Sequence, residues 1–271
     1  MKSAVTICLV PEARKGPFVF HDGLEQGCEA AAALGFDAVE IFPSGADELL
    51  AARPAAVAAS HGLAIAAVGT GAGYVKHGLH LVHHDATVRQ TAREFIRALI
   101  DSAADLGAPA IIGSMQGRSS PEVPRDAALD HLAAALTELG SQAAARGQVL
   151  LYEPLNRYET DLFSRQEEAA AFLDARGIAG VKLLCDLFHM NIEEADLAGT
   201  LRTCGRHVGH VHWADSNRRA IGLGHTDAAP VVAALESIGY TGYLSAEVLP
   251  LPSPEAAARH SIESFCRHVR T

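Results

Sequence analysis

The sequence lacks the cysteine pattern of a disulfide-stabilised or zinc-finger protein. Its 271 residues include five cysteines, an odd number, and no two of them form a Cys-x-x-Cys pair. Disulfide frameworks and structural zinc sites use even-numbered or closely spaced cysteines. The scattered cysteines are Cys8, Cys28, Cys185, Cys204 and Cys266. We therefore expect free thiols and a reducing, cytoplasmic compartment.

The sequence also lacks long hydrophobic runs and an excess of positive charge. No apolar stretch approaches the roughly 18 residues that a membrane-spanning helix needs. The apolar run at 4–10 is too short for a signal peptide with its cleavage site, and it is better explained as a first strand. The formal net charge of −10 argues against a duplex nucleic-acid binder, because such proteins normally present a basic face. We expect neither a membrane nor a nucleic acid as partner.

What the chain does contain is a regular alternation of two kinds of segment. Apolar runs rich in β-branched residues alternate with amphipathic segments rich in alanine and leucine, which predicts strands and helices in turn. The expected strands are 4–10, 38–42, 63–70, 108–114, 149–153, 181–186, 208–215 and 243–249. The expected helices cover about 24–34, 46–60, 87–106, 125–146, 165–175, 193–204, 228–238 and 254–269. Glycines such as Gly35, Gly107 and Gly147 follow these helices and act as stop signals.

This alternation predicts an α/β fold, a (β/α)8 TIM barrel. The strands are apolar on both faces, as in a parallel sheet that helices cover. Eight strand–helix units in a chain of 271 residues fit a TIM barrel. A doubly wound open sheet is the alternative, although it usually has fewer units. No linker, low-complexity segment or block of one charge divides the chain, so we expect 1–271 to form a single domain.

Polar residues recur at the carboxyl ends of the last four expected strands. In a TIM barrel these ends form the mouth at which the active site lies. Glu153, Asp186, His212 and Glu247 fall there, and consecutive members are one strand–helix unit apart. We therefore expect these four side chains to converge at similar heights.

Such a group fits a single divalent metal ion. Carboxylates buried without a partner are costly, and a cation removes that cost. Three carboxylates and one imidazole suit Mn²⁺, Mg²⁺ or Co²⁺ better than a structural zinc. Each acid alone is better explained as a helix cap or an ion-pair partner, but four on adjacent strands favour the metal. His210 lies one layer deeper on the same face as His212, and we expect a buried core histidine there.

Four segments carry a resemblance to a known family. They are YEPLNRYE (152–159), CDLFHMN (185–191), GHVHWADSNR (209–218) and LSAEV (244–248). Together with ALGFDAVEIF (33–42) and AADLGAPAII (103–112), they resemble the sugar phosphate isomerase/epimerase superfamily of xylose isomerase-like TIM barrels. Within that superfamily the likeness is greatest to the D-tagatose 3-epimerase and hydroxypyruvate isomerase branches.

The resemblance implies roles for individual residues. It implies that the four residues above bind one divalent metal, most often Mn²⁺, and that Glu153 and Glu247 are also the acid/base pair of a sugar or sugar-phosphate isomerase or epimerase. The reaction would abstract a proton and pass through a metal-stabilised enediolate. Substrate oxygens would be contacted by His189, Arg218 and Glu159. Glu40 matches no ligand, and it is expected to bond within the barrel or to reach the edge of the substrate. A homodimer or homotetramer is expected from the resemblance only.

Three other functions stay open at this point. A dehydratase of the same superfamily, of the inosose or 3-dehydroshikimate type, would use the same metal and the same proton abstraction. An apurinic endonuclease shares the barrel but needs extra histidines, and a D-x-H pair after the seventh strand, where 225–227 reads His-Thr-Asp. A non-enzymatic sugar-binding protein would not need an intact acid/base pair.

Several loops are expected to surround the site. The segment 69–85 contains His77, His80, His83 and His84, and it is expected to be a long loop acting as a lid, with a solvated loop or a second metal patch as alternatives.

Other loop residues have narrower expected roles. Gln116 and Arg118 are candidates for holding a substrate hydroxyl or phosphate. Arg157 is expected to orient Glu153, with a loop ion pair to Glu159 as the alternative. Asp227 is expected to cap a helix.

Overall fold

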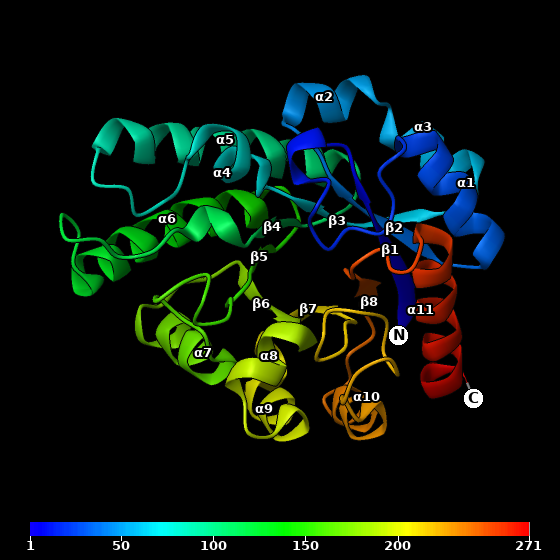
Figure 1. The fold of residues 1–271 in the computed structure, drawn as a ribbon. Coiled ribbons are helices and arrows are strands. Elements are labelled where there is room, and N and C mark those ends of the chain that lie inside the picture. The colour runs from blue at the N-terminus through cyan, green and yellow to red at the C-terminus, as the bar shows by residue number, and fades with distance from the viewer. Residues whose placement is uncertain (271) are drawn as a thin grey trace.

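The computed structural model describes residues 1–270, and the chain forms a closed barrel of eight parallel strands (Figure 1). Each strand pairs with its neighbours in sequence, and β1 pairs with β8 to close the barrel. The strands are β1 (Lys2–Cys8), β2 (Ala38–Phe42), β3 (Ala64–Gly69), β4 (Ala110–Ile112), β5 (Leu150–Tyr152), β6 (Val181–Asp186), β7 (Val208–His212) and β8 (Tyr243–Ala246). The predicted TIM barrel is therefore confirmed.

Helices surround the barrel on the outside, and the last helix, α11, lies beside α1 (Figure 1). The helices are α1 (Leu24–Leu34), α2 (Ala46–Ala51), α3 (Pro54–Ser60), α4 (Ala72–His77), α5 (Ala86–Asp105), α6 (Arg125–Ala145), α7 (Gln166–Ala175), α8 (Leu187–Glu193), α9 (Leu197–Cys204), α10 (Ala228–Ser237) and α11 (Pro254–Val269). None of the helices within residues 1–270 has the length and hydrophobicity required to cross a bilayer.

Two expected helices differ from the structure. The helix expected over 46–60 is divided into α2 and α3, because Pro54 lacks the N–H that a helix interior needs. Arg53 takes a left-handed φ of 49° at the break, and Pro54 begins the new helix. The helix expected from residue 193 is also preceded by a separate helix, α8, which begins directly after β6.

The apolar core consists of one large cluster and three smaller ones. The large cluster lies between the strands and the helices that cover them, as the two-faced hydrophobicity of the strands predicts. A smaller cluster includes Ala67, Ile111, Leu151 and Leu184. Leu151 and Leu184 lie two residues before Glu153 and Asp186, so they share the same face of the strands, one layer deeper. Each fully buried leucine stabilises the fold by about 1.5–3 kcal/mol, and this layer forms a packed floor below the polar residues.

Candidate metal and catalytic site

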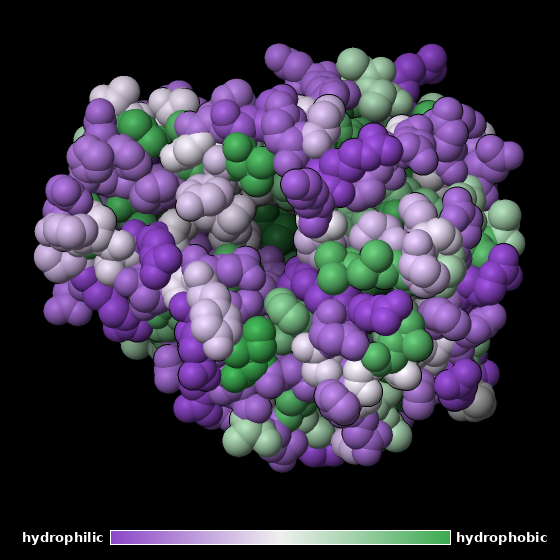
Figure 2. All heavy atoms as spheres, in the orientation of Figure 1, coloured by the Kyte–Doolittle hydropathy of each residue, from purple (hydrophilic) through white to green (hydrophobic). Residues whose placement is uncertain are grey.

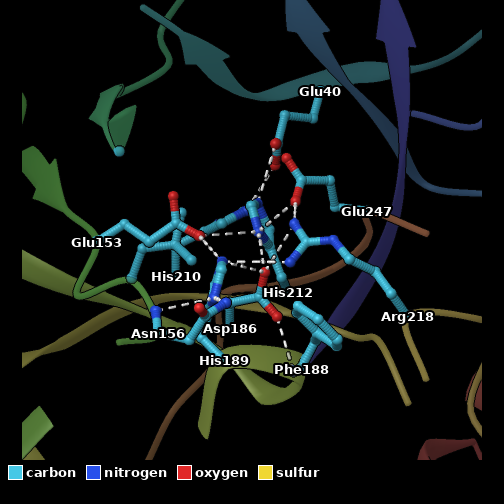
Figure 3. A network of polar contacts seen from close by, with 12 residues as sticks. Glu40, Glu153, Asn156, Asp186, Phe188, His189, His210, His212, Arg218 and Glu247 are labelled. Carbon is cyan, nitrogen blue, oxygen red and sulfur yellow. Dashed lines mark hydrogen bonds and ion pairs between the residues drawn. The ribbon is translucent and has the colours of Figure 1, made fainter. Parts of the chain in front are cut away.

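The barrel brings the four expected metal ligands together at one mouth (Figure 3). Asp186 and His212 are the last residues of β6 and β7, while Glu153 and Glu247 directly follow β5 and β8. Each offers a donor atom, and these atoms all lie within 4.8 Å of one another. Glu153, Asp186 and His212 are buried, and the Glu247 side chain is only 12% exposed. The expected convergence at similar heights is thus what the structure shows.

The His212 ring has two different neighbourhoods. Its Nδ1 faces the three carboxylates, at 3.3 Å from Asp186 Oδ2, 3.4 Å from Glu247 Oε2 and 3.7 Å from Glu153 Oε1. Its Nε2 lies 3.1 Å from Glu40 Oε1 on the other side. A hydrogen bond at one ring nitrogen fixes the tautomer and leaves the other nitrogen free to act as a ligand. The geometry therefore presents Nδ1 to the carboxylates.

Glu40 and His210 form a second buried layer. Glu40 Oε2 lies 2.8 Å from His210 Nε2, so one carboxylate contacts both histidines of β7. His210 is 2% exposed, and this partner agrees with the expected buried core histidine. Glu40 bonds within the barrel, which was the first of its two expected roles. Glu40, His210 and His212 also have donor atoms close enough to form a second ligand group, but His212 belongs to both groups.

Burial and neighbouring charges separate the pKa values of the acids. Burial raises the pKa of Glu153 well above its usual value, and the nearby charges of Glu247 and Asp186 add to this effect. Burial likewise raises the pKa of Glu247. Burial would raise the pKa of Asp186 too, but the Arg218 guanidinium and His189 hold it below its usual value.

The pKa of His212 shifts against the direction that burial alone would give. Burial would lower its pKa, but the Glu247 and Glu40 carboxylates outweigh burial and raise the pKa. The positively charged side chains of the protein thus do not neutralise all of the carboxylates, because Glu153 and Glu247 keep raised pKa values. A divalent cation at these oxygens would complete the compensation, so the residues present fit such an ion.

His189 lies on α8, the helix that begins directly after β6. Asp186 caps this helix, since its Oδ1 accepts the Phe188 N–H at 2.8 Å. The backbone N–H of Asn156 donates to His189 Nδ1 at 3.1 Å, so Nδ1 is the unprotonated nitrogen. Burial lowers the pKa of His189 to about 4, which keeps the ring neutral near pH 7. Its Nε2 therefore carries the proton, and this nitrogen lies 3.7 Å from Asp186 Oδ2 and 3.2 Å from Arg218 Nη1.

Arg218 reaches the cluster from the loop after β7. Its guanidinium is ion-paired with Glu247 and lies 3.2 Å from Asp186 Oδ2. It also stacks on the Phe188 ring, with the guanidinium carbon 4.6 Å from the ring centre. Burial would lower the pKa of Arg218, but the Asp186 and Glu247 carboxylates raise it, so the side chain stays charged.

A cavity of about 290 Å³ opens over the cluster, and the molecule is hollowed near the middle of the face shown in Figure 2. Its lining includes the polar residues Glu153, His212 and Glu247, and also Phe18 and Phe42, which belong to one apolar cluster. The two rings pack with centres 4.5 Å apart.

Gly113 lies directly against the Glu153 carboxylate. A Cβ at this position would be 2.6 Å from Glu153 Oε2, so a larger residue would require this carboxylate to move.

The expected substrate-binding residues lie at this cavity. His189, Arg218 and Glu159 all line it. The Glu159 side chain is 50% exposed, and its Oε1 accepts from Asn156 Nδ2 at 2.9 Å. Asn156 thus contacts both Glu159 and His189, a connection that the sequence motif did not reveal.

Arg157 and Gln116 do not have their expected partners. Arg157 binds Glu193 on α8 with Nε 2.9 Å from Oε1, so it neither orients Glu153 nor pairs with Glu159. Gln116 is buried, and its Nε2 donates to the backbone carbonyls of Gly113 and Glu153. It therefore supports the strand ends and does not face a substrate.

Arg118 and Asp227 lie outside the cavity. Arg118 is exposed and does not line it. Asp227 caps α10 as expected, because its Oδ1 accepts the Ala229 N–H at 3.2 Å.

The segment 69–85 is not structureless, because it contains α4. Gly71 and Val75 of this segment line the cavity, so it does border the site. The His83 ring packs between those of His80 and His84, with centres 5.0 and 4.2 Å away. Within residues 1–270, however, these histidines belong to neither group of side chains that could hold a metal ion. The structure thus gives no support to a second metal patch.

Comparison with known proteins gives the family. The family model described as "Xylose isomerase-like TIM barrel" matches residues 28–268. A D-psicose 3-epimerase of Agrobacterium fabrum is 31% identical over 237 residues, which cover 85% of this chain and 78% of that protein. The chain belongs to the family of xylose isomerase-like TIM barrels.

Three further similarities complete this comparison. A 3-dehydro-D-guloside 4-epimerase of Escherichia coli is 35% identical over 40% of this chain and 42% of that protein. A crystal structure of D-psicose 3-epimerase determined in the presence of D-fructose has a TM-score of 0.79 at 22% identity, with both chains fully covered. An AP endonuclease of family 2 from Brucella melitensis also shares the fold, with a TM-score of 0.76 at 20% identity. Structural similarity alone therefore does not separate these activities.

Proposed function

We propose that the protein is a divalent-metal-dependent ketose 3-epimerase, an enzyme of the isomerase class. The observation that carries the proposal is the pair Glu153 and Glu247, a buried and a largely buried glutamate that converge with Asp186 and His212 and border one cavity, and whose pKa values burial raises. A general base or acid works best when its pKa is near the working pH, and burial moves a carboxyl group in that direction. The similarity to D-psicose and L-ribulose 3-epimerases supports the same reaction class.

The residues of this chain divide the reaction between them. Glu153, Asp186, His212 and Glu247 would hold the metal, which supplies positive charge that polarises a carbonyl and stabilises developing negative charge. One of the two glutamates accepts the proton from the carbon beside the carbonyl, which gives an enediolate. The other glutamate returns a proton to the opposite face of the same carbon, so the configuration inverts. Return of the proton to the adjacent carbon would instead give aldose–ketose isomerisation.

His189 and Arg218 bind the oxygens of the substrate in this proposal. The fixed tautomer of His189 makes its Nε2–H a donor to a hydroxyl or carbonyl oxygen. Arg218 keeps its charge beside Glu247 and is a second donor at the same end of the cavity. Both donors act where oxygen charge develops, and such preorganised donors contribute strongly to catalysis.

The cavity favours a sugar without a phosphate group. A phosphate is typically bound by arginine or lysine. The residues lining this cavity include one arginine, Arg218, which is already paired with Asp186 and Glu247. Phe18 and Phe42 in the lining offer apolar contacts in place of a cation. We therefore assign a free ketose as the substrate class.

The proposal is tested by solvent deuterium uptake. Purified protein with Mn²⁺ is incubated in D₂O with ketoses, ketose phosphates and hydroxypyruvate, and the products are read by NMR. Deuterium at C3 with a new diastereomer supports the 3-epimerase. Deuterium at C1 or C2 identifies an aldose–ketose isomerase, while a lack of exchange on any sugar with metal bound turns the assignment toward a dehydratase.

The remaining assignments belong to the same proposal. We expect Mn²⁺ to give the highest activity, ahead of Mg²⁺ and Co²⁺, because the site is made mainly of oxygen donors. We expect a cytoplasmic enzyme that acts as a dimer or tetramer, with residues 1–271 folding as one domain. Light scattering on the purified protein measures the assembly, and metal-exchange activity assays rank the ions.

A further inference from the structure

One buried carboxylate at the barrel mouth has no part in the chemistry proposed above. Asp215 follows β7 by three residues and is fully buried. Its Oδ1 accepts the backbone N–H groups of Ser216 at 2.7 Å and Thr226 at 2.9 Å. Its Oδ2 accepts those of Gly222 at 2.7 Å and Gly224 at 2.9 Å. A single side chain thus joins both ends of the loop 215–226.

The backbone of this loop also closes on Asp215. The Arg218 N–H donates to the Asp215 carbonyl, and the Asp215 N–H donates to the Arg219 carbonyl, both at 2.8 Å. The chain lies so close to the carboxylate that a Cβ at Gly224 would be 2.4 Å from Asp215 Oδ1. The loop is therefore wound tightly around this one carboxylate.

Arg218 is the residue that this winding holds in an unusual backbone conformation. Its φ of 57° is in the left-handed region, which residues with a Cβ seldom adopt. Its carbonyl accepts the N–H of Leu249 at 2.8 Å, which ties the loop to the segment after β8. Such a conformation persists only where surrounding contacts determine it, and they are most numerous at Asp215.

The fixed backbone directs the guanidinium across the mouth of the barrel. Arg218 reaches Glu247 and Asp186, and its Nη1 lies 3.2 Å from His189 Nε2. These contacts join residues that follow three different strands, β6, β7 and β8. A small rotation of the backbone at residue 218 would move the end of this long side chain by much more than the backbone itself.

We propose that Asp215 is the positioning residue for Arg218, and that its carboxylate fixes the loop 215–226 so that the guanidinium is held at the substrate end of the cavity. This inference rests on the proposed function only in giving Arg218 a role at the substrate. The geometric part, that Asp215 fixes the loop and aims the guanidinium, is independent of the reaction.

A double-mutant cycle tests the link between the two residues. Asp215→Asn is expected to lower kcat/KM on the order of 100-fold, the usual effect of a small misplacement of a site group. In the background of Arg218→Ala, the same change is expected to lower kcat/KM less than about 3-fold, because little positioning is left to lose. Equal losses in both backgrounds would overturn the proposal, because Asp215 would then act independently of Arg218.

Hydrogen exchange provides a readout that needs no substrate. In Asp215→Asn, the amides of Ser216, Gly222, Gly224 and Thr226 are expected to exchange at least about 10-fold faster, because their shared acceptor is weakened. Unchanged exchange of these amides would overturn the proposal whatever the reaction is. Faster exchange in a wild-type-like fold, with no ketose turned over by the unmodified protein, would instead count against the proposed function alone.

Two further variants protect the test. If Asp215→Asn fails to fold, Gly224→Ala can replace it, because the added Cβ would displace the same carboxylate. Gly224→Ala should also lower kcat/KM much less in the background of Arg218→Ala than in the unmodified protein. Asp227→Ala is the matched control, because it removes a carboxylate at the end of the same loop that caps α10. It should leave kcat/KM within about 2-fold of the unmodified protein and should not speed exchange at 216–226, as expected for a cap remote from the cavity.

Discussion

Two buried carboxylates at the same mouth of the barrel behave in opposite ways. Asp215 accepts four backbone N–H groups, and although burial alone would raise its pKa, these donors hold the pKa below its usual value. Glu153 lies among other carboxylates, and burial raises its pKa well above the usual value. Both groups are hidden from water, so burial alone does not distinguish them. The difference lies in the partners: backbone donors make a carboxylate structural, while competing acids leave one free to exchange a proton or bind a cation.

Glu153→Gln should have the largest effect on activity. It tests whether Glu153, the carboxylate with the raised pKa, exchanges a proton with the substrate. We expect kcat to fall by about 10²- to 10⁴-fold, the range that a general acid or base contributes. An amide has nearly the shape of the carboxylate but cannot take up the proton. Single-turnover deuterium exchange measures the loss, and wild-type rates would remove Glu153 from the mechanism.

The same variant should not lose stability in the metal-free protein. Because the folded state raises the pKa of Glu153, its ionised form is disfavoured in the fold at neutral pH, and a neutral amide relieves this. The urea midpoint of Glu153→Gln should therefore equal or exceed that of the unmodified protein in the presence of a chelator. A clearly lower midpoint would mean that Glu153 is structural, like Asp215.

His212→Ala should abolish stoichiometric metal binding. The ring presents Nδ1 to three carboxylates, and its loss leaves an all-carboxylate group around a gap. Elemental analysis after dialysis against Mn²⁺ should give well below one ion per chain, whereas the unmodified protein should hold one. Unchanged stoichiometry would rule His212 out as a ligand.

Glu40→Gln should weaken the metal site without destroying it. Glu40 contacts His212 Nε2 and so fixes the ring from behind. The loss of such a partner typically lowers metal affinity or activity by about 10- to 100-fold. Titration with Mn²⁺ followed by calorimetry measures this change, and an affinity within 2-fold or so of the unmodified protein would show that packing alone orients the ring.

The smallest expected effects concern the contribution of Asp215 to the unfolding free energy of the protein and the dependence of this contribution on pH. Asp215→Asn should cost about 1–3 kcal/mol of unfolding free energy, because buried N–H groups lose their acceptor. Since folding lowers the pKa of Asp215 below 3.8, its contribution is present above that pH and is lost as the pH falls through the folded-state value. Urea unfolding at a series of pH values should show a constant difference between the two proteins above pH 3.8 that narrows as the pH falls further. A difference that does not narrow below that pH would contradict the pKa shift.

The sequence predicted the barrel and its four converging side chains, because both follow from periodicity. The period and the order of the strands place the carboxyl ends of β5 to β8 at one mouth of the barrel, independently of the loop conformations. Glu40 was missed as a partner of His212, although both are polar residues in apolar strands and each requires a partner inside the barrel.

Features that depend on loop backbone were not predictable in this way. The hydrogen bonds of Asp215 and Asn156 go to or come from backbone N–H groups, whose positions no residue pattern specifies. The start of α8 at Asp186 had a signal, since aspartate is a common N-cap, but its expected role as a metal ligand obscured that signal. Arg157 was assigned by its position near Glu153, while its partner Glu193 lies on α8, which was not expected.

Closure of the barrel by β8 against β1 also determines when the site can exist during synthesis. The candidate ligands leave the ribosome in the order Glu153, Asp186, His212 and Glu247, and the last of them directly follows the strand that closes the barrel. At about 5–20 residues per second, several seconds separate the first glutamate from the last. A nascent chain therefore holds an incomplete acidic cluster and an unpaired β1 edge until β8 and Glu247 have been synthesised. Closure of the barrel and completion of the site are the same event.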